Sequence, residues 1–344
     1  MRFVIKELKS VNNPRSIHGI YPYRGKISAI DAEQVLSQMP AGSVVLDPFC
    51  GSGTIVYEGL KYGLKTIGID ANPIAVALSN GKIHIPPNFL IVEEEIKHLI
   101  QQSVNLKKAP VAPEYPKSLF HETSLEQVMR MSVFYEEMSD YVRACFLGSI
   151  ALTARGCNHY KWTSSTVGKN IEPKQYIPFY EKFEQKCKKH YLPIVNTSQI
   201  YYADSRKLLD FLKPNSIDFV FSSPPYFDCL DYTAYHARII YDILGYERVH
   251  IRSSLIQNFE NYKEDMQIVL NNLNKVLKPG GQIIFVVGDK KIHGQIINGA
   301  KFLQDICPFG KYEIIERSYS GTSSKVFDEI NKTNRKEQII IWTK

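Results

Sequence analysis

The sequence predicts an α/β fold: a Rossmann-like, mainly parallel sheet with helices on both faces, plus a mainly helical insertion. Short β-branched runs alternate with segments of helical spacing over residues 17–82 and again over 199–344. A glycine-containing turn joins the first strong strand signal to a helix. Between these regions, 83–198 carries mainly helical spacing. We therefore expect one α/β domain built from 17–82 and 199–344, with 83–198 inserted into it.

The composition is that of a folded protein with a basic surplus. Of the 344 residues, 44% are hydrophobic and 22% are charged, which argues against disorder. The net charge of +7 is compatible with a polyanionic partner but does not require one. Six dispersed cysteines, with no Cys-x-x-Cys pair, favour a reducing compartment and argue against a metal site or a disulfide framework. No signal peptide and no apolar run near the ~18 residues of a membrane span is evident, so we predict a cytoplasmic protein without a membrane partner.

The first strand signal, 43–47, ends in a turn that looks built for a ligand. Asp47 closes the strand, Pro48 forces a turn, and Gly51 and Gly53 open a predicted helix at 54–62. Glycine tolerates positive φ and lets a ligand approach the backbone, so this is a candidate cradle at a helix N-terminus.

The next strand signal, 65–70, narrows the kind of ligand. It ends in Asp70, and an acid about 20 residues past a glycine-rich turn is placed to accept hydrogen bonds from ribose hydroxyls. No Gly-Lys-Ser/Thr follows Gly53, which disfavours a phosphate loop. The third glycine of a dinucleotide fingerprint is also missing.

Spacing predicts the remaining elements. Helices are expected at 30–39, 178–190, 235–244 and 259–277, with an irregular stretch after 83, one long helical pattern over 124–154, and a helix through 209–211. The chain returns to α/β patterning at 200–205, and strands are expected at 217–221, 282–287, 311–317 and 337–343, with a tight turn at 278–281.

The strand at 217–221 runs into Ser223-Pro224-Pro225-Tyr226. Two consecutive prolines cannot continue a β ladder, so they fix a rigid turn at the strand's carboxyl end. Ligands of open α/β sheets bind at the carboxyl ends of strands. We therefore expect this turn and the cradle at 47–53 to face one crevice.

Two basic stretches in the insertion are candidates for nucleic-acid contact. Lys161, Trp162 and Lys169 are interleaved with small hydroxyl residues in a polar loop, as in DNA-binding loops, although ordinary exposed loops share this composition. On the predicted helix 178–190, four lysines are expected on a solvated face, with phosphate contact as the alternative: Lys182, Lys186, Lys188 and Lys189.

Together these motifs resemble the S-adenosylmethionine-dependent amino-methyltransferases of DNA, which methylate cytosine N4 or adenine N6. Residues 47–54, Asp-Pro-Phe-Cys-Gly-Ser-Gly-Thr, resemble the family's cofactor loop, and 223–226 resembles its catalytic Ser/Asp/Asn-Pro-Pro-Tyr/Phe tetrapeptide. Residues 21–26, Asp204-Ser205 and 277–281 agree more loosely with other family segments.

The resemblance implies a methyltransferase sheet, S-adenosylmethionine as cofactor and DNA as partner, with a cognate restriction endonuclease as a further possible partner. Asp70 would bind the ribose hydroxyls and Asp204 the adenine amine. Expected cofactor-binding residues are Tyr23, Asp47, Pro48, Phe49, Cys50, Gly51, Gly53, Thr54, Asp70 and Asp204. Ser223, Pro224, Pro225 and Tyr226 would hold a flipped target base. The insertion 83–198 takes the place of a target-recognition region.

Several functions remain open at this point. A serine at the start of the tetrapeptide favours cytosine N4 over adenine N6, although adenine enzymes also use it. An RNA guanine-N2 methyltransferase would share the cofactor loop and a Pro-Pro-Tyr turn, and a non-catalytic nucleic-acid-binding module could retain the fold. Cytosine-C5 chemistry is set aside because none of the six cysteines follows a proline.

Overall fold

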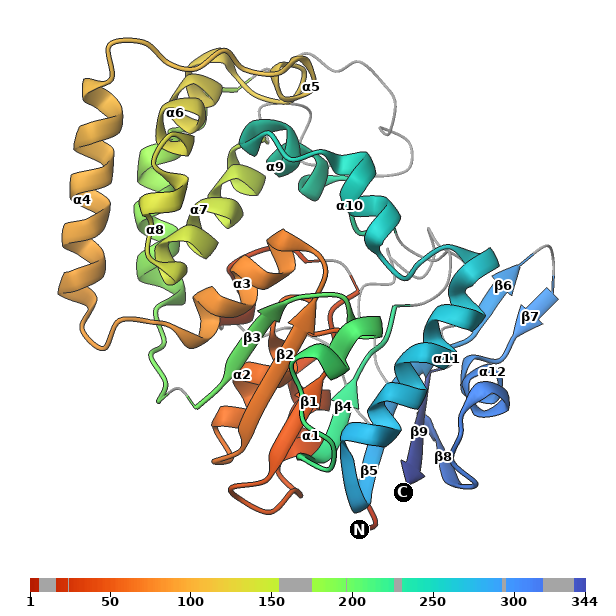
Figure 1. The fold of residues 1–344 in the computed structure, drawn as a ribbon. Helices are drawn as coiled ribbons and strands as arrows, with labels where there is room; N and C mark the ends of the chain where they lie inside the picture. Colours follow the sequence, from red (N-terminus) through yellow and green to blue (C-terminus); the bar gives the residue numbers. More distant parts are fainter. Residues whose placement is uncertain are drawn as a thin grey trace.

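A computed structural model describes residues 1–5, 17–23, 25–154, 175–195, 197–225, 231–292, 295–317 and 337–344. Within these ranges the core is a seven-stranded sheet in the order β3-β2-β1-β4-β5-β9-β8 (Figure 1). The strands are β1 (Val44–Asp47), β2 (Lys65–Asp70), β3 (Gln199–Tyr202), β4 (Ile217–Ser222), β5 (Leu277–Gly288), β8 (Lys311–Arg317) and β9 (Glu337–Thr343). Neighbours from β3 to β5 are parallel, and β9 runs antiparallel between β5 and β8. This arrangement confirms the predicted Rossmann-like sheet.

Both faces of the sheet are buried, as the alternation along β4 shows. Phe219 and Phe221 pack into a cluster with α1 (Ala29–Leu36) and Ile55 of α2 (Thr54–Leu60). Val220 points to the opposite face, where α11 (Phe259–Val276) and α12 (Gly299–Ile306) pack. The predicted helices on both faces are therefore present.

Residues between β2 and β3 build a helical layer on the β3 side of the sheet, away from β8 (Figure 1). Its helices are α3 (Pro73–Ile83), α4 (Phe89–Asn105), α5 (Glu114–Lys117), α6 (Glu122–Ser132), α7 (Asp140–Thr153) and α8 (Phe179–His190). These helices share one hydrophobic cluster with α9 (His236–Leu244) and with the segment that follows η1 (Ile17–Gly19). The helical layer is thus packed onto the α/β part through a continuous core.

The long helical pattern over 124–154 is broken, contrary to expectation. α6 ends at Ser132, a 3₁₀ turn η2 spans Tyr135–Glu137, and α7 begins at Asp140. The Ser139 backbone N–H and hydroxyl both donate to the Glu95 carboxylate, at 2.6 and 2.7 Å. The carboxylate of α4 thus satisfies the N–H of the residue that caps the start of α7.

The stretch expected to be irregular after 83 contains the 17-residue helix α4. Its N-cap is Asn88, whose side chain accepts a hydrogen bond from the Leu90 N–H at 3.0 Å. Asn88 thus starts a helix directly after Pro86 and Pro87, which disfavour helix only up to that point.

Three further expectations need correction. The helix through 209–211 is a 3₁₀ helix, η5 (Ser205–Asp210), and the turn at 278–281 is an irregularity inside β5 with Gly280 at φ 78°. Lys186 is only 6% exposed and its Nζ donates to the Ile20 carbonyl at 2.8 Å, so it neither lies on a solvated face nor contacts phosphate.

The remaining elements are α10 (Arg248–Ser254) and a separate hairpin of β6 (Lys290–Ile292) and β7 (Gln295–Ile297). In the part of the chain that the structure describes, no helix combines the length and apolar character that a membrane span requires.

Candidate cofactor and substrate site

A pocket opens where β1, β2 and β4 end and the chain leaves β3. The space between its walls, with the open mouth included, amounts to about 800 Å³. Eleven sequence-predicted site residues line it: Tyr23, Asp47, Pro48, Phe49, Cys50, Gly51, Thr54, Asp70, Asp204, Ser223 and Pro225. The cradle after β1 and the turn after β4 therefore share one cavity.

Two other predicted residues, Gly53 and Pro224, are close to the pocket but do not line it. Gly53 is the N-cap of α2 at φ 72°, and a Cβ there would lie 2.8 Å from Ser79 Oγ. Gly51, at φ 51°, lies under the Tyr23 ring, which a Cβ would approach to 3.1 Å. The two glycines let the loop turn in the left-handed region while α3 and Tyr23 close over it.

Four predicted residues lie outside the described ranges: Tyr226 of the tetrapeptide and the three candidates for DNA contact, Lys161, Trp162 and Lys169. Their roles remain predictions from the sequence.

Asp47 ties the cradle to the strand that carries the Pro-Pro turn. Its Oδ1 accepts hydrogen bonds from the Ser222 hydroxyl at 2.6 Å and from the Phe49 N–H at 3.1 Å. Because the carboxyl is buried, its pKa is raised to about 7, against the effect of these two bonds. Asp47 thus holds the loop and the end of β4 together.

Asp70 closes β2 and shapes the other side of the loop. Its two oxygens accept the Gly51 and Asn72 backbone N–H groups, each at 2.8 Å. Burial raises its pKa to about 6. Two carboxyls that are difficult to ionise therefore lie at one pocket, an arrangement typical of functional sites.

Some polar atoms at the pocket have no hydrogen-bond partner in the described part of the chain. They are Thr54 Oγ1 and Asn72 Nδ2, both on residues that line the cavity. The other end of the Asn72 amide is satisfied, since Oδ1 accepts from Ile74 N at 2.9 Å and Tyr241 OH at 2.8 Å. Buried orphan donors of this kind are expected where a ligand completes the hydrogen bonding.

Cys50 is a packing residue of the loop. It is 4% exposed, its Sγ lies 3.6 Å from Ser79 Oγ, and burial raises the pKa of the thiol well above its usual value. A thiol held protonated in this way is a poor nucleophile.

The Ser223–Pro225 turn is fixed from the side of α11. The Tyr262 hydroxyl donates to the Pro225 carbonyl at 2.7 Å. The register between β1 and β4 pairs Leu46 with Val220, so the two strands end side by side. The turn is therefore held at the same edge of the sheet as Asp47.

Sequence reasoning missed several residues of the site. Asn72 had a signal, because an Asn followed by Pro is an N-cap with Pro at the first helical position. Ser222 directly precedes the tetrapeptide and has no local signal of its own. Tyr232 and the wall formed by Ser254, Leu255 and Ile256 reach the pocket only through tertiary folding and carry no local signal.

Comparisons with known proteins agree with this geometry. Residues 32–80 match a family model described as DNA methylase, N6_N4_Mtase. The chain is 32% identical over 77 residues to the type II methyltransferase M.MjaII of Methanocaldococcus jannaschii, covering 22% of this chain and 14% of that protein. It is 22% identical over 276 residues to the type II methyltransferase M.BsoBI of Geobacillus stearothermophilus, covering 66% and 52%. The chain thus spans about half or less of the length of these curated relatives.

Among solved structures, TrmN from Thermus thermophilus aligns over 96% of this chain and 53% of its own, with 11% identity and a TM-score of 0.39. A geranyl diphosphate methyltransferase in complex with SAM aligns over 100% and 99%, with 8% identity and a TM-score of 0.40. The strand order and the pocket at the strand ends define a Rossmann-like fold with a ligand site at the carboxyl ends of its strands. The sequence matches make residues 32–80, and more weakly about two thirds of the chain, similar to the DNA amino-methyltransferases.

Proposed function

We propose that this protein transfers the methyl group of S-adenosylmethionine to the exocyclic amine of a base in DNA, and that the base is cytosine, modified at N4. The observation that carries the proposal is the shared cavity. The glycine loop after β1 and the Ser223–Pro225 turn after β4 both line it, so a methyl donor and an acceptor amine could meet there.

The residues of the pocket fit this cofactor. Asp47 and Asp70 offer carboxylates for a ligand that carries a sulfonium, an ammonium and ribose hydroxyls, while Thr54 and Asn72 offer unsatisfied polar atoms. Asp70 is expected to take the ribose hydroxyls and Asp204 the adenine amine. When bound, S-adenosylmethionine supplies an electrophilic methyl group on a sulfonium.

The chain's own contribution is to make a poor nucleophile competent. The lone pair of a nucleobase amine is delocalised into the ring, and acceptors on its N–H groups favour a tetrahedral, reactive nitrogen. We assign this role to the Ser223 hydroxyl and the Pro224 carbonyl, with Tyr226 as a stacking face worth about 1–3 kcal/mol. The base must leave the duplex to reach them, and positioning then supplies much of the rate.

The insertion 83–198 is the proposed target-recognition region. Residues 83–198 hold α4 to α8 and include Lys161, Trp162 and Lys169. The type II methyltransferases matched above support a modification enzyme that acts at a specific DNA sequence, either with a cognate endonuclease or alone.

Methyl transfer from labelled S-adenosylmethionine tests the proposal directly. Duplex DNA, single-stranded DNA and tRNA are offered in parallel, and modified nucleosides are identified by mass spectrometry. N4-methylcytosine in DNA is the expected product. Label found only in tRNA would replace the DNA assignment by an RNA methyltransferase, and N6-methyladenine would overturn the choice of base.

Variants separate catalysis from binding. Ser223→Ala and Pro225→Ala are expected to abolish transfer, because they remove an acceptor or loosen the turn, while calorimetry shows cofactor affinity within about threefold of the unaltered protein. Equal loss of transfer and binding would mean that the turn is only structural. No cofactor binding by the unaltered protein would favour a nucleic-acid-binding module instead.

A further inference from the structure

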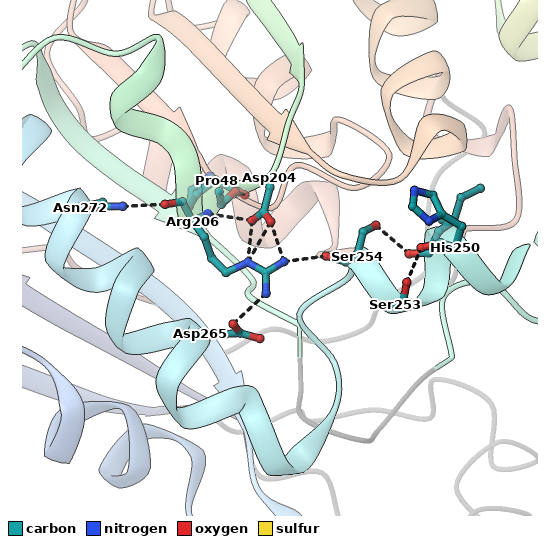
Figure 2. A network of polar contacts seen from close by, with 10 residues as sticks. Pro48, Asp204, Arg206, His250, Ser253, Ser254, Asp265 and Asn272 are labelled. Atoms are coloured by element: carbon teal, nitrogen blue, oxygen red, sulfur yellow. Dashed lines mark hydrogen bonds and ion pairs between the residues drawn. The ribbon is translucent and has the colours of Figure 1, made fainter. Parts of the chain in front are cut away.

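Arg206 lies behind the pocket wall and joins three segments (Figure 2). Its Nε and Nη2 donate to the two carboxylate oxygens of Asp204, at 2.6 to 3.0 Å. Its Nη1 donates to Asp265 on α11 at 2.8 Å, and Nη2 also donates to the Ser254 carbonyl at 3.1 Å. The hydrogen bonds to Asp204 raise the pKa of the guanidinium further, so its charge is permanent.

The orientation of Asp204 follows from these contacts. Its Oδ1 also accepts the Arg206 backbone N–H at 2.9 Å, so the carboxylate is held both as the N-cap of η5 and by the guanidinium. A carboxylate has about four lone-pair directions. The backbone N–H and the guanidinium of Arg206 occupy most of those of Asp204. Few directions are left for a ligand, and they are fixed.

The same guanidinium also holds a second residue of the pocket lining. Ser254 is the last residue of α10, and its carbonyl is one of the acceptors that a helix end leaves without an intrahelical partner. Asp204 and Ser254 both line the pocket, whereas Arg206 does not. Asp265 and Asn272, whose amide donates to the Arg206 carbonyl at 2.8 Å, anchor the group to α11.

We propose that Arg206 is the positioning residue for the adenine end of the cofactor. It aims the free acceptor directions of Asp204 at the exocyclic amine and sets the separation between Asp204 and the wall at Ser254. The inference rests on the proposed cofactor and on the adenine contact of Asp204. Lysine cannot replace this arginine, because an ammonium is a point charge without the planar fork that reaches both oxygens.

The test compares S-adenosylhomocysteine with S-inosylhomocysteine, in which a carbonyl oxygen replaces the adenine amine. By calorimetry the unaltered protein is expected to prefer the adenine compound about 30-fold, because a fixed carboxylate accepts from the amine and repels the carbonyl. In Arg206→Lys the affinity for the adenine compound falls about tenfold and the preference shrinks to about threefold. Arg252→Lys is the matched control, since Arg252 lies on α10 and pairs with Asp231 at 3.6 Å, and both affinities should stay unchanged.

Equal losses for both compounds in Arg206→Lys, with the preference intact, would show a merely structural role and overturn the proposal. Unchanged affinities would overturn it as well. Should Arg206→Lys not fold, Asp265→Asn keeps the Asp204 fork but frees the guanidinium from α11, and the preference should then fall about threefold. A preference equal to that of the unaltered protein would overturn the proposal.

The binding assay contains no nucleic acid, so an error in the base assignment leaves its outcome unchanged and appears only in the transfer assay. Failure of the unaltered protein to bind either compound would contradict the cofactor assignment and the role of Arg206 together.

Discussion

At the scale of single residues, the two buried carboxyls of the pocket make cofactor binding depend on pH. Asp47 has a pKa of about 7 and Asp70 of about 6, both raised by burial, so both are protonated in acid. A cationic ligand favours the ionised carboxylates. At a pH where a carboxyl is protonated in the free protein, it must therefore lose its proton when the ligand binds. We expect affinity for S-adenosylmethionine to fall from pH 7 to 5, by about tenfold per pH unit for each carboxyl that must ionise.

Calorimetry in two buffers of different ionisation enthalpy measures this proton release. Asp47→Asn is the informative variant, because the amide oxygen can still accept from Ser222 and Phe49 while the charge is gone. It should weaken binding at pH 7 and flatten the pH dependence. Affinity that stays constant between pH 5 and 7 in the unaltered protein would contradict the assignment of both carboxyls to the cofactor.

Residues of this kind could be found from the sequence only where a local signal marks them. Asp47 and Asp70 each end a strand that a short β-branched and apolar run reveals, and the glycines between them mark the turn. Ser254 ends α10 and Tyr262 lies on α11, and both reach the site only through tertiary folding, so nothing near them in sequence indicates it. Arg206 carries no complete local signal, because Asp204 lies two residues before it but Asp265 lies 59 residues after it, and only folding brings Asp265 to the guanidinium.

At the scale of elements, the start and end of α2 provide a matched pair of glycines. Gly53 and Gly63 both have positive φ, of 72° and 68°, but only Gly53 is crowded, with Ser79 Cα 2.9 Å from the site of a Cβ. Gly63→Ala should cost about 1 kcal/mol for the left-handed backbone alone. Gly53→Ala should cost about 3 kcal/mol in urea unfolding, because the clash adds to that strain, and should also weaken cofactor binding.

Equal losses of unfolding free energy in the two variants would mean that α3 moves away from the added methyl group without measurable cost. Retained cofactor affinity in Gly53→Ala would mean that the loop does not depend on this close approach.

The hydrogen bond from α11 to the Pro-Pro turn gives a second prediction at this scale. Tyr262→Phe removes the donor to the Pro225 carbonyl and leaves the ring in place. We expect kcat for methyl transfer to fall about fivefold, with cofactor affinity unchanged, since one neutral hydrogen bond contributes about 1 kcal/mol. Tyr62→Phe is the control, because its hydroxyl contacts Glu33 at the surface. A fall in cofactor affinity with kcat unchanged would contradict this role, because Tyr262 would then act on cofactor binding and not on the Pro-Pro turn.

Elements were predictable where periodicity was strong and local. β1, β2, β4 and β9 follow from alternation and β-branched runs, and α11 from its apolar stripe. The start of α7 is held by Glu95, which lies 44 residues from Ser139, so no local window could contain this contact. The N-cap of α4, Asn88, is a local signal, but it stands beside prolines that favour an irregular chain.

At the scale of the whole molecule, the helical layer contacts the segment that carries Tyr23. Gly148, inside α7, faces the Ile20 carbonyl so closely that a Cβ would come within 1.9 Å of the oxygen. Gly148→Ala should destabilise the protein by about 2 kcal/mol or more, although alanine is the better helix former, and should weaken cofactor binding through the displaced Tyr23 segment. Urea unfolding and calorimetry measure the two effects.

Gly310→Ala is the control, since no atom lies within 4 Å of a Cβ there and its backbone is not left-handed. A Gly148 variant as stable as this control would contradict the close contact between the layers. Loss of stability without loss of affinity would separate the helical layer from the cofactor site.

The position of β9 has a consequence for how the chain reaches this structure. β9 lies between β5 and β8, and β1 pairs with β4 although more than 170 residues separate them. Contacts between such distant segments carry a large loop-closure entropy, and folding slows as mean sequence separation rises. Until such distant segments pair, β1 lacks β4 and β5 lacks β9. The unpaired edges of these apolar strands are then open to aggregation. We therefore expect slow refolding, on the scale of seconds or longer, and a yield that falls as protein concentration increases.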